Sequence, residues 1–344
     1  MAKKDKPKLN YGAEVKRLKE QGPERLYLLC GPEDYLRECF LEELRKCCGV
    51  TEEDFGYQRF NGANLDLDQL RQAVDSLPFF AQRSLVEVRD YDLAKCREAD
   101  CKRLKALVED IPDYCTLVFV YAAGVDPDGR SAAVKAVKKA GYTIEFTPQD
   151  QGALVRWVQN RFAGLGKQIS SAEAQYLIFL CGSGMSRLIP EIEKAASFAP
   201  GDTVSRAHID ATADPIPEAN IYNMVELLAQ RRYDDAAGLL RDLQGDKSYP
   251  PIRINALIGQ QMRRMYAQKA GQAAGRSRGD IMELCELRYD FHYDKLSAAA
   301  KPFSLEQLGA YVSLCAEYDF RMKSTGQDAG LLLRELFARL AAGV

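Results

Sequence analysis

The chain changes from a helical to a strand pattern within the stretch Ser76-Leu-Pro-Phe-Phe-Ala-Gln-Arg-Ser-Leu-Val-Glu-Val-Arg-Asp90. Pro78 ends the helical pattern, because proline clashes with the preceding turn and has no N–H donor. The β-branched apolar run after it indicates a strand. Phe79 and Phe80 occupy the connection, where Gly, Asn, Asp and Ser are usual. Two interpretations stay open: the rings cover the core, or they form an exposed anchor for a partner.

Strand and helical patterns alternate on both sides of this stretch. The strand patterns cover residues 25–30, 57–61, 84–89, 116–121 and 142–146, and the helical patterns cover 13–20, 34–48, 66–75, 98–109 and 131–140. Strands that alternate with helices of about ten residues imply right-handed crossovers and a mostly parallel sheet. The sequence therefore predicts a three-layer α/β domain over residues 1–148.

Beyond this domain the strand patterns stop and every element is predicted to be helical. The helical patterns cover residues 149–162, 170–181, 186–198, 205–213, 218–230, 233–243, 251–270, 280–287, 289–299, 304–323 and 328–341. The segment Asp214-Pro-Ile-Pro217 separates the first four from the rest, since two prolines so close cannot continue a helix. Residues 271–279 are expected to form a flexible connector. The sequence thus predicts a small helical domain, 149–214, and an all-α domain, 215–344.

The composition is that of an ordinary globular protein, with 344 residues, 47% hydrophobic and 28% charged. The net charge of −2 argues against a protein that holds nucleic acid by bulk electrostatics. No apolar run approaches the roughly 20 residues that span a bilayer. The lysine-rich start, residues 1–10, has no apolar segment after it and is not a secretory signal. We expect a cytoplasmic protein without a membrane partner.

The ten cysteines do not form a pattern that is typical of a metal site. None makes a Cys-x-x-Cys pair, and the chain has only two histidines, His208 and His292. Structural zinc sites normally show close ligand pairs. We therefore expect no metal, and we interpret the cysteines as small buried hydrophobic residues in a reducing compartment.

A strand, Gly31 and a helix have the layout of a phosphate-binding loop, in which backbone N–H groups hold the phosphates. The lysine and the Ser/Thr hydroxyl of that motif are absent, and Glu33 and Asp34 would meet the phosphates with like charge. Arg37 could supply a cation and Asp90 a metal ligand, but no general-base glutamate follows Asp90. We expect a degenerate loop at Gly31, no bound cofactor and no catalytic residues.

Several segments, taken in order, are similar to one known family. They are Tyr27-Leu-Leu-Cys-Gly31-Pro-Glu-Asp-Tyr-Leu36, Phe60-Asn61, Ser76-Leu-Pro-Phe-Phe-Ala-Gln-Arg-Ser-Leu-Val86, Leu117-Val-Phe-Val120, Trp157, Arg187-Leu-Ile-Pro-Glu-Ile-Glu-Lys194 and Tyr318-Asp319 with Lys323. With them the chain resembles, over nearly its whole length, the delta subunits of bacterial DNA polymerase III, which open the sliding clamp within the clamp loader. The number of cysteines departs from the family pattern.

The resemblance implies an AAA+ fold in three parts: a RecA-like domain, 1–148, a helical lid, 149–214, and a helical collar, 215–344. It implies a subunit that does not hydrolyse ATP itself but belongs to the DNA polymerase III holoenzyme, a DNA-directed DNA polymerase and nucleotidyltransferase as a complex. Its partners would be the sliding clamp and, through the collar, the other clamp-loader subunits. Primed DNA would be met only within the complex.

The family's clamp-binding element is an apolar plug, which falls on Leu77, Pro78, Phe79 and Phe80 of this chain. The resemblance therefore favours the anchor interpretation of these residues. Two other hypotheses stay open: an active AAA+ nucleotidase, and a helical adaptor of another replication or repair assembly.

Overall fold

Five parallel strands form the sheet of the first half of the chain. The computed structural model describes residues 9–78 and 81–343. The strands are β1 (Leu26–Cys30), β2 (Tyr57–Asn61), β3 (Ser84–Arg89), β4 (Cys115–Val120) and β5 (Tyr142–Glu145), in the spatial order β2-β3-β4-β1-β5. All four neighbouring pairs are parallel, so the residues before each strand meet at one edge of the sheet and the residues after it at the other.

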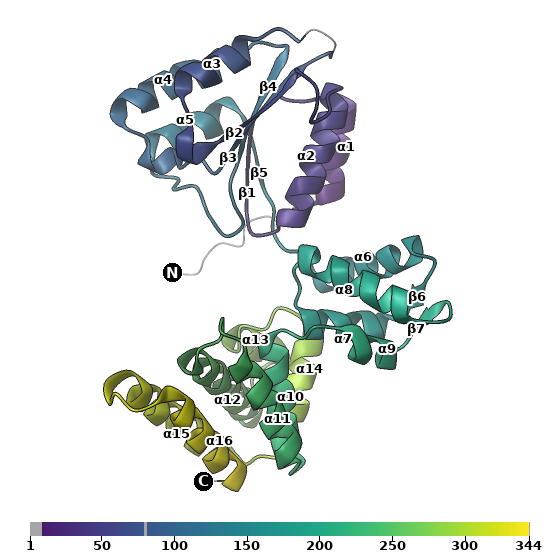
Figure 1. The fold of residues 1–344 in the computed structure, drawn as a ribbon, viewed down its shortest axis with the longest axis vertical. Coiled ribbons are helices and arrows are strands. Elements are labelled where there is room, and N and C mark those ends of the chain that lie inside the picture. The colour runs from purple at the N-terminus through teal and green to yellow at the C-terminus, as the bar shows by residue number, and fades with distance from the viewer. Residues whose placement is uncertain (1–8, 79–80, 344) are drawn as a thin grey trace. The chain divides into compact units, whose positions relative to one another are not determined.

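Helices cover both faces of this sheet (Figure 1). On one face lie α1 (Tyr11–Gln21) and α2 (Asp34–Cys48), and on the other α3 (Leu67–Asp75), α4 (Glu98–Glu109) and α5 (Ala132–Ala140), with the short 3-10 turns η1 (Gly62–Asn64) and η2 (Leu93–Lys95) between elements. Side chains of a strand alternate between the two faces, so Leu26 and Leu28 of β1 pack with the core under α3, α4 and α5, while Tyr27 packs edge-on against Phe40 of α2. The predicted three-layer arrangement is confirmed.

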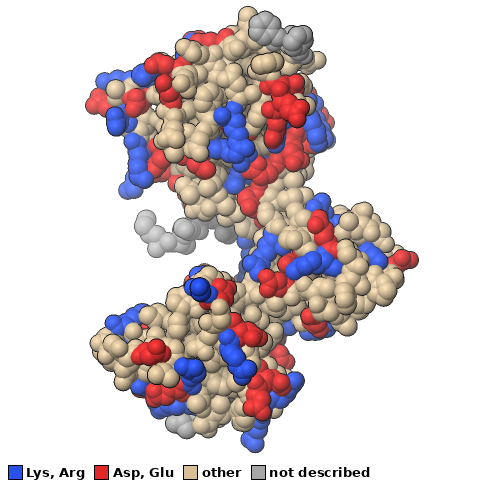
Figure 2. Space-filling model, in the orientation of Figure 1, with Lys and Arg blue, Asp and Glu red and all other residues tan. Residues whose placement is uncertain are grey.

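The chain divides into two compact units. The first contains Met1–Gln149 with Gly184–Ser186, and the second contains Asp150–Ser183 and Arg187–Val344. The division of the second unit into a lid, 149–214, and a collar, 215–344, stays a prediction. The charges of both signs are interspersed on both units over the face that Figure 2 shows.

The second unit begins with helices around a very small sheet. Its first elements are α6 (Gln151–Gly164), β6 (Gln168–Ile169), α7 (Ser171–Cys181), α8 (Met185–Phe198), β7 (Thr203–Val204) and α9 (Arg206–Thr212). The prediction that no strands follow residue 148 is wrong, because β6 and β7 pair in parallel, Gln168 with Thr203 and Ile169 with Val204. Strands of two residues are too short to show an alternating pattern.

Seven further helices complete the second unit. They are α10 (Pro217–Ala229), α11 (Tyr233–Gly245), α12 (Pro251–Ala273), α13 (Arg278–Leu284), α14 (Asp290–Ala300), α15 (Leu305–Ser324) and α16 (Ala329–Ala342). The long helix α12 contacts each of the other six. Gly259 lets it approach α15, since a Cβ there would lie 3.3 Å from the Cβ of Cys315. The connector expected at 271–279 is shorter than predicted, because α12 continues to Ala273. The predicted fold class, an α/β domain followed by helical domains, is confirmed.

Gly31 provides a test of the fold where β1 turns into α2. Its φ is +110°, and an added Cβ would lie 2.4 Å from the backbone oxygen of Phe146. Gly31→Ala therefore combines left-handed strain of about 1–2 kcal/mol with overpacking of about 1–3 kcal/mol. We expect calorimetry of the full chain to show a melting temperature several degrees lower.

Gly124→Ala is the matched control, because Gly124 has φ +78° but nothing within 4 Å of the added Cβ. It should show the strain alone and a smaller decrease in melting temperature. Equal decreases for the two variants would contradict the close contact between Gly31 and Phe146.

Candidate functional site

The connection between α3 and β3 is held firmly at the end of α3. The hydroxyl of Tyr114 donates a hydrogen bond to the carbonyl oxygen of Asp75, the last helical residue, at 3.0 Å. Arg71, one turn earlier, contacts the carboxylates of Asp75 at 2.6 Å and Asp110 at 2.8 Å. The hydrogen bond from Tyr114 and the contact with Asp110 join the end of α3 to the segment that precedes β4. The chain therefore leaves α3 from a fixed point.

The other end of the connection is held by the same segment. The backbone N–H of Ser84, the first residue of β3, donates to the carbonyl oxygen of Tyr114 at 2.8 Å. The guanidinium of Arg83 donates to the carbonyl of Pro23 at 3.0 Å and to the hydroxyl of Thr116 at 3.2 Å. Tyr114 thus contacts both ends of the connection, with its hydroxyl at one and its backbone oxygen at the other.

The described residues that directly follow α3 are accessible to solvent. The side chain of Leu77 is 64% exposed and that of Pro78 is half-buried. Of the four residues predicted to form the plug, Phe79 and Phe80 lie outside the described residues. The connection lies at the edge where the parallel strands begin, which is opposite to the edge that follows β1 and carries Gly31.

One exposed residue beside this connection was not singled out from the sequence. Phe55, in the turn before β2, is 92% exposed. The turn lies next to the connection because the N–H of Leu85 donates to the carbonyl of Gly56 at 2.8 Å. In the sequence, the signal is a phenylalanine in a polar turn, the same signal that drew attention to Phe79 and Phe80.

The loop at Gly31 uses its backbone groups internally. The N–H of Glu33 donates to the carbonyl of Phe146 at 3.0 Å, and the N–H of Phe146 donates to the carbonyl of Cys30 at 2.7 Å. Pro32 has no N–H to offer. A phosphate needs several backbone N–H groups that point toward it. At this loop one of them is missing and another is already bonded to the protein.

Arg37 and Asp90, the other residues considered for a nucleotide site, are placed differently from each other. Arg37 is buried, and its guanidinium donates to the carbonyl of Gly31 at 3.0 Å. Asp90 is exposed after β3 with a φ of +59°, and its N–H donates to Val120 at 2.9 Å. Within the described residues, no group of three or more His, Cys, Asp or Glu could hold a metal ion.

A polar cluster around the buried carboxylate of Glu87, absent from the sequence-based predictions, joins β2, β3 and α2. Glu87 is fully buried in β3 and accepts a hydrogen bond from the hydroxyl of Tyr57 at 2.8 Å. Arg89 contacts Glu87 and forms two parallel hydrogen bonds with Glu38, at 2.8 and 2.7 Å. Burial and then the Glu87 carboxylate raise the pKa of Tyr57 above its usual range. The cluster links β3, the strand that follows the α3–β3 connection, to α2, the helix that follows Gly31.

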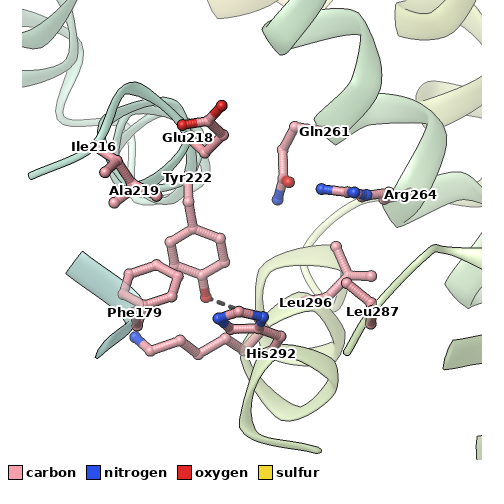
Figure 3. Close-up of a pocket in the computed structure, with 11 residues that line it drawn as sticks. Phe179, Ile216, Glu218, Ala219, Tyr222, Gln261, Arg264, Leu287, His292 and Leu296 are labelled. Carbon is pink, nitrogen blue, oxygen red and sulfur yellow. Dashed lines mark hydrogen bonds between the residues drawn. The ribbon is translucent and has the colours of Figure 1, made fainter. Parts of the chain in front are cut away.

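A pocket in the second unit is lined by packed side chains and contains one half-buried histidine, His292 (Figure 3). Its volume is about 110 Å³. Phe179 and Tyr222 lie on one side of it, and the Tyr222 hydroxyl donates to the carbonyl of Lys295 at 2.8 Å. Burial, with Arg264 and Lys295 nearby, lowers the pKa of His292 to about 4, so this imidazole is neutral at pH 7. The pocket is lined by Phe179, Ile216, Glu218, Ala219, Tyr222, Gln261, Arg264, Leu287, His292, Lys295 and Leu296. Among these residues, no nucleophile or carboxylate contacts the imidazole of His292.

The other histidine, His208, and the ten cysteines have structural roles. The Nδ1 atom of His208 accepts a hydrogen bond from the N–H of Ser205 at the start of α9, at 3.2 Å. All ten cysteines are free thiols, and six of them are buried. Burial raises the pKa of Cys48, Cys181 and Cys315 to about 12, so they are poor nucleophiles at pH 7. Among the described helices, none has both the length and the apolar character that a membrane span requires.

Comparisons with known proteins identify sequences that are similar to both halves of the chain. A family model described as DNA polymerase III, delta subunit, matches residues 27–147, and one described as DNA polymerase III delta subunit, C-terminal domain, matches residues 218–340. DNA polymerase III subunit delta of Bacillus subtilis (strain 168) is 26% identical over 332 residues, which are 94% of each protein. The probable DNA polymerase III subunit delta of Aquifex aeolicus (strain VF5) is 21% identical over 320 residues, 91% of this chain and 90% of that protein.

A solved structure shows the same fold. The Bacillus subtilis DNA clamp loader delta protein superposes with a TM-score of 0.55 at 24% identity, covering 96% of this chain and 99% of that one. The two family models together span more than two thirds of the chain and lie on both of its units. The chain belongs to the family of DNA polymerase III delta subunits, as the ordered motifs of its sequence predicted.

Proposed function

We propose that this chain is a non-hydrolysing subunit that opens the sliding clamp for loading onto primed DNA. Its clamp-binding element would be Leu77, Pro78, Phe79 and Phe80. The observation that carries the proposal is the connection between α3 and β3, which is anchored at both ends and presents an exposed Leu77 between them. An apolar side chain that follows a fixed helix end can enter a pocket on a partner without losing much conformational entropy.

The free energy of burying the plug side chains is large enough to support their role as an anchor. Full burial of three large apolar side chains contributes roughly 4–9 kcal/mol, at about 1.5–3 kcal/mol each. Association removes a large part of this through lost translational and rotational freedom. A binder opens a ring only to the extent that it binds the open form more tightly than the closed form. The remaining free energy must therefore include contacts that the closed ring does not allow.

The absence of intrinsic ATP hydrolysis is part of the same proposal. Lys and Ser/Thr do not follow Gly31, and the loop donates to its own backbone and accepts from Arg37. The chain would act in the cytoplasm as one subunit of the DNA polymerase III holoenzyme, with catalysis in other subunits. Its helices in 215–344 would join the other clamp-loader subunits. Phe320, 68% exposed, and Leu331, 60% exposed, supply apolar surface for such contacts.

Truncating the plug should weaken clamp binding without affecting folding. Leu77→Ala removes apolar area that is largely exposed in the free chain, so we expect the Kd for the sliding clamp to rise roughly five- to thirtyfold, about 1–2 kcal/mol. Phe79→Ala with Phe80→Ala should cost several kcal/mol of clamp binding. Surface plasmon resonance with immobilised clamp measures both, and calorimetry measures the melting temperature.

Leu165→Ala is the matched control, because Leu165 is 47% exposed and lies in the second unit. It should change neither quantity. If the two rings cover the core, the double variant will instead lose roughly 3–5 kcal/mol of stability for each ring. Unchanged clamp affinity together with a lowered melting temperature would end the plug hypothesis.

The purified chain should retain no radiolabelled ATP, because its loop lacks the phosphate-binding residues. In a reconstituted clamp loader, Asp90→Asn should leave the ATPase rate nearly unchanged. Asparagine removes the charge and tolerates the positive φ of this position. Retained ATP on the wild-type chain, or a tenfold loss of loader ATPase in the variant, would favour the alternative of an active AAA+ nucleotidase.

A further inference from the structure

Phe55 is the most exposed large apolar side chain in the part of the chain that the structure describes, at 92%. Single exposed hydrophobic residues are ordinary on protein surfaces. A phenylalanine with almost all of its surface in water is less usual, and Phe55 also lies beside the proposed clamp-binding element. The side chain contributes little to the fold, since almost none of it is buried.

The turn that carries Phe55 is well ordered by its own hydrogen bonds. The N–H and the hydroxyl of Thr51 donate to one carboxylate oxygen of Asp54, at 2.6 and 2.8 Å. These two bonds lower the pKa of Asp54, the backbone bond first. The N–H of Tyr57 then donates to the carbonyl of Asp54 at 2.9 Å as β2 begins. Phe55 is therefore presented from a backbone with a defined conformation.

The turn is continuous with the connection between α3 and β3. The parallel pairing of β2 and β3 brings Tyr57 opposite Leu85, and the N–H of Leu85 donates to the carbonyl of Gly56. A Cβ placed on Gly56 would lie 3.7 Å from the Cβ of Ala81. Ala81 directly follows Phe80 in the sequence. Phe55 and the plug thus come from two adjacent segments at one edge of one sheet.

The size of a stable interface also requires more than the plug. Specific protein–protein interfaces bury about 800 Å² on each partner. A buried aromatic side chain contributes about 150–250 Å², so the plug alone covers only part of that area. The surface around the plug must supply the rest. The largest exposed apolar group described there is Phe55.

We propose that Phe55 is a second apolar anchor for the same sliding clamp, on the clamp surface beside the pocket that receives the plug. This inference rests on the proposed clamp-binding function. Because Leu77 and Phe55 come from neighbouring segments at one edge of the sheet, the second contact forms at high effective concentration once the first has formed. Phe55 would act mainly by slowing dissociation, as most residues at interfaces do.

The test compares variants of the full chain for binding to immobilised sliding clamp. Phe55→Ala should weaken binding about tenfold, mostly through a faster dissociation rate. Phe55→Leu should retain most of the affinity, because it keeps most of the apolar volume. Glu53→Ala, in the same turn and also exposed, is the matched control and should bind like the wild type. None of the three should change the melting temperature by more than a degree or two.

The outcomes separate this inference from the function on which it rests. If Leu77→Ala weakens binding and Phe55→Ala stays within twofold of the wild type, the second anchor is wrong and the clamp-binding function stands. If the wild-type chain does not bind the clamp at all, both are wrong. If Phe55→Ala binds the clamp normally but joins the other loader subunits less well, Phe55 contacts a loader subunit and the inference is overturned.

Discussion

The contact of Tyr114 with both ends of the α3–β3 connection determines where the exposed Leu77 lies. Its hydroxyl holds the last carbonyl of α3, and its backbone oxygen holds the first N–H of β3. Without these bonds neither end of the connection would have a fixed position, and the exposed Leu77 would follow a loosely held helix end. With them, Leu77 follows a fixed helix end, beside a sheet whose central strands β1 and β4 are fully buried.

The two edges of the same sheet have different properties. At the edge where the strands end, which in open α/β sheets usually binds ligands, the Gly31 loop is closed by the backbone of Phe146 and by Arg37. At the edge where the strands begin, Leu77 and Phe55 are exposed. The cluster of Glu38, Glu87 and Arg89 joins α2 to β3. One edge of this sheet thus has a closed loop, and the opposite edge has exposed apolar side chains.

Much of the fold could be predicted from the sequence, for identifiable reasons. The strand at residues 84–89 and the helix at 34–48 have the predicted bounds, since buried parallel strands read as continuous apolar runs and glycines or prolines border the helices. The two-residue strands β6 and β7 depend on contacts between distant segments, which leave no local pattern. The helix α12 extends through Gly271 because packing against neighbouring helices outweighs the low helix propensity of glycine.

The candidate site could be predicted only at residues that break a local rule, namely that surface connections favour Gly, Asn, Asp and Ser over large apolar residues. Adjacent phenylalanines in a connection drew attention to the plug, and Leu77 is indeed exposed. Tyr114 and Glu87 follow no such rule, because their importance comes from hydrogen bonds to residues about 30 or more positions away. Phe55 broke the same rule as the plug, but one aromatic residue in a turn is a weak signal until the neighbouring segment is known.

Hydrogen exchange of the full chain, measured with and without clamp, tests whether the edge where the strands begin binds the sliding clamp. We expect slower exchange in residues 50–56 and 76–83 on binding, with little change in residues 31–37. Protection confined to the helices of 215–344, with none in 76–83, would contradict it.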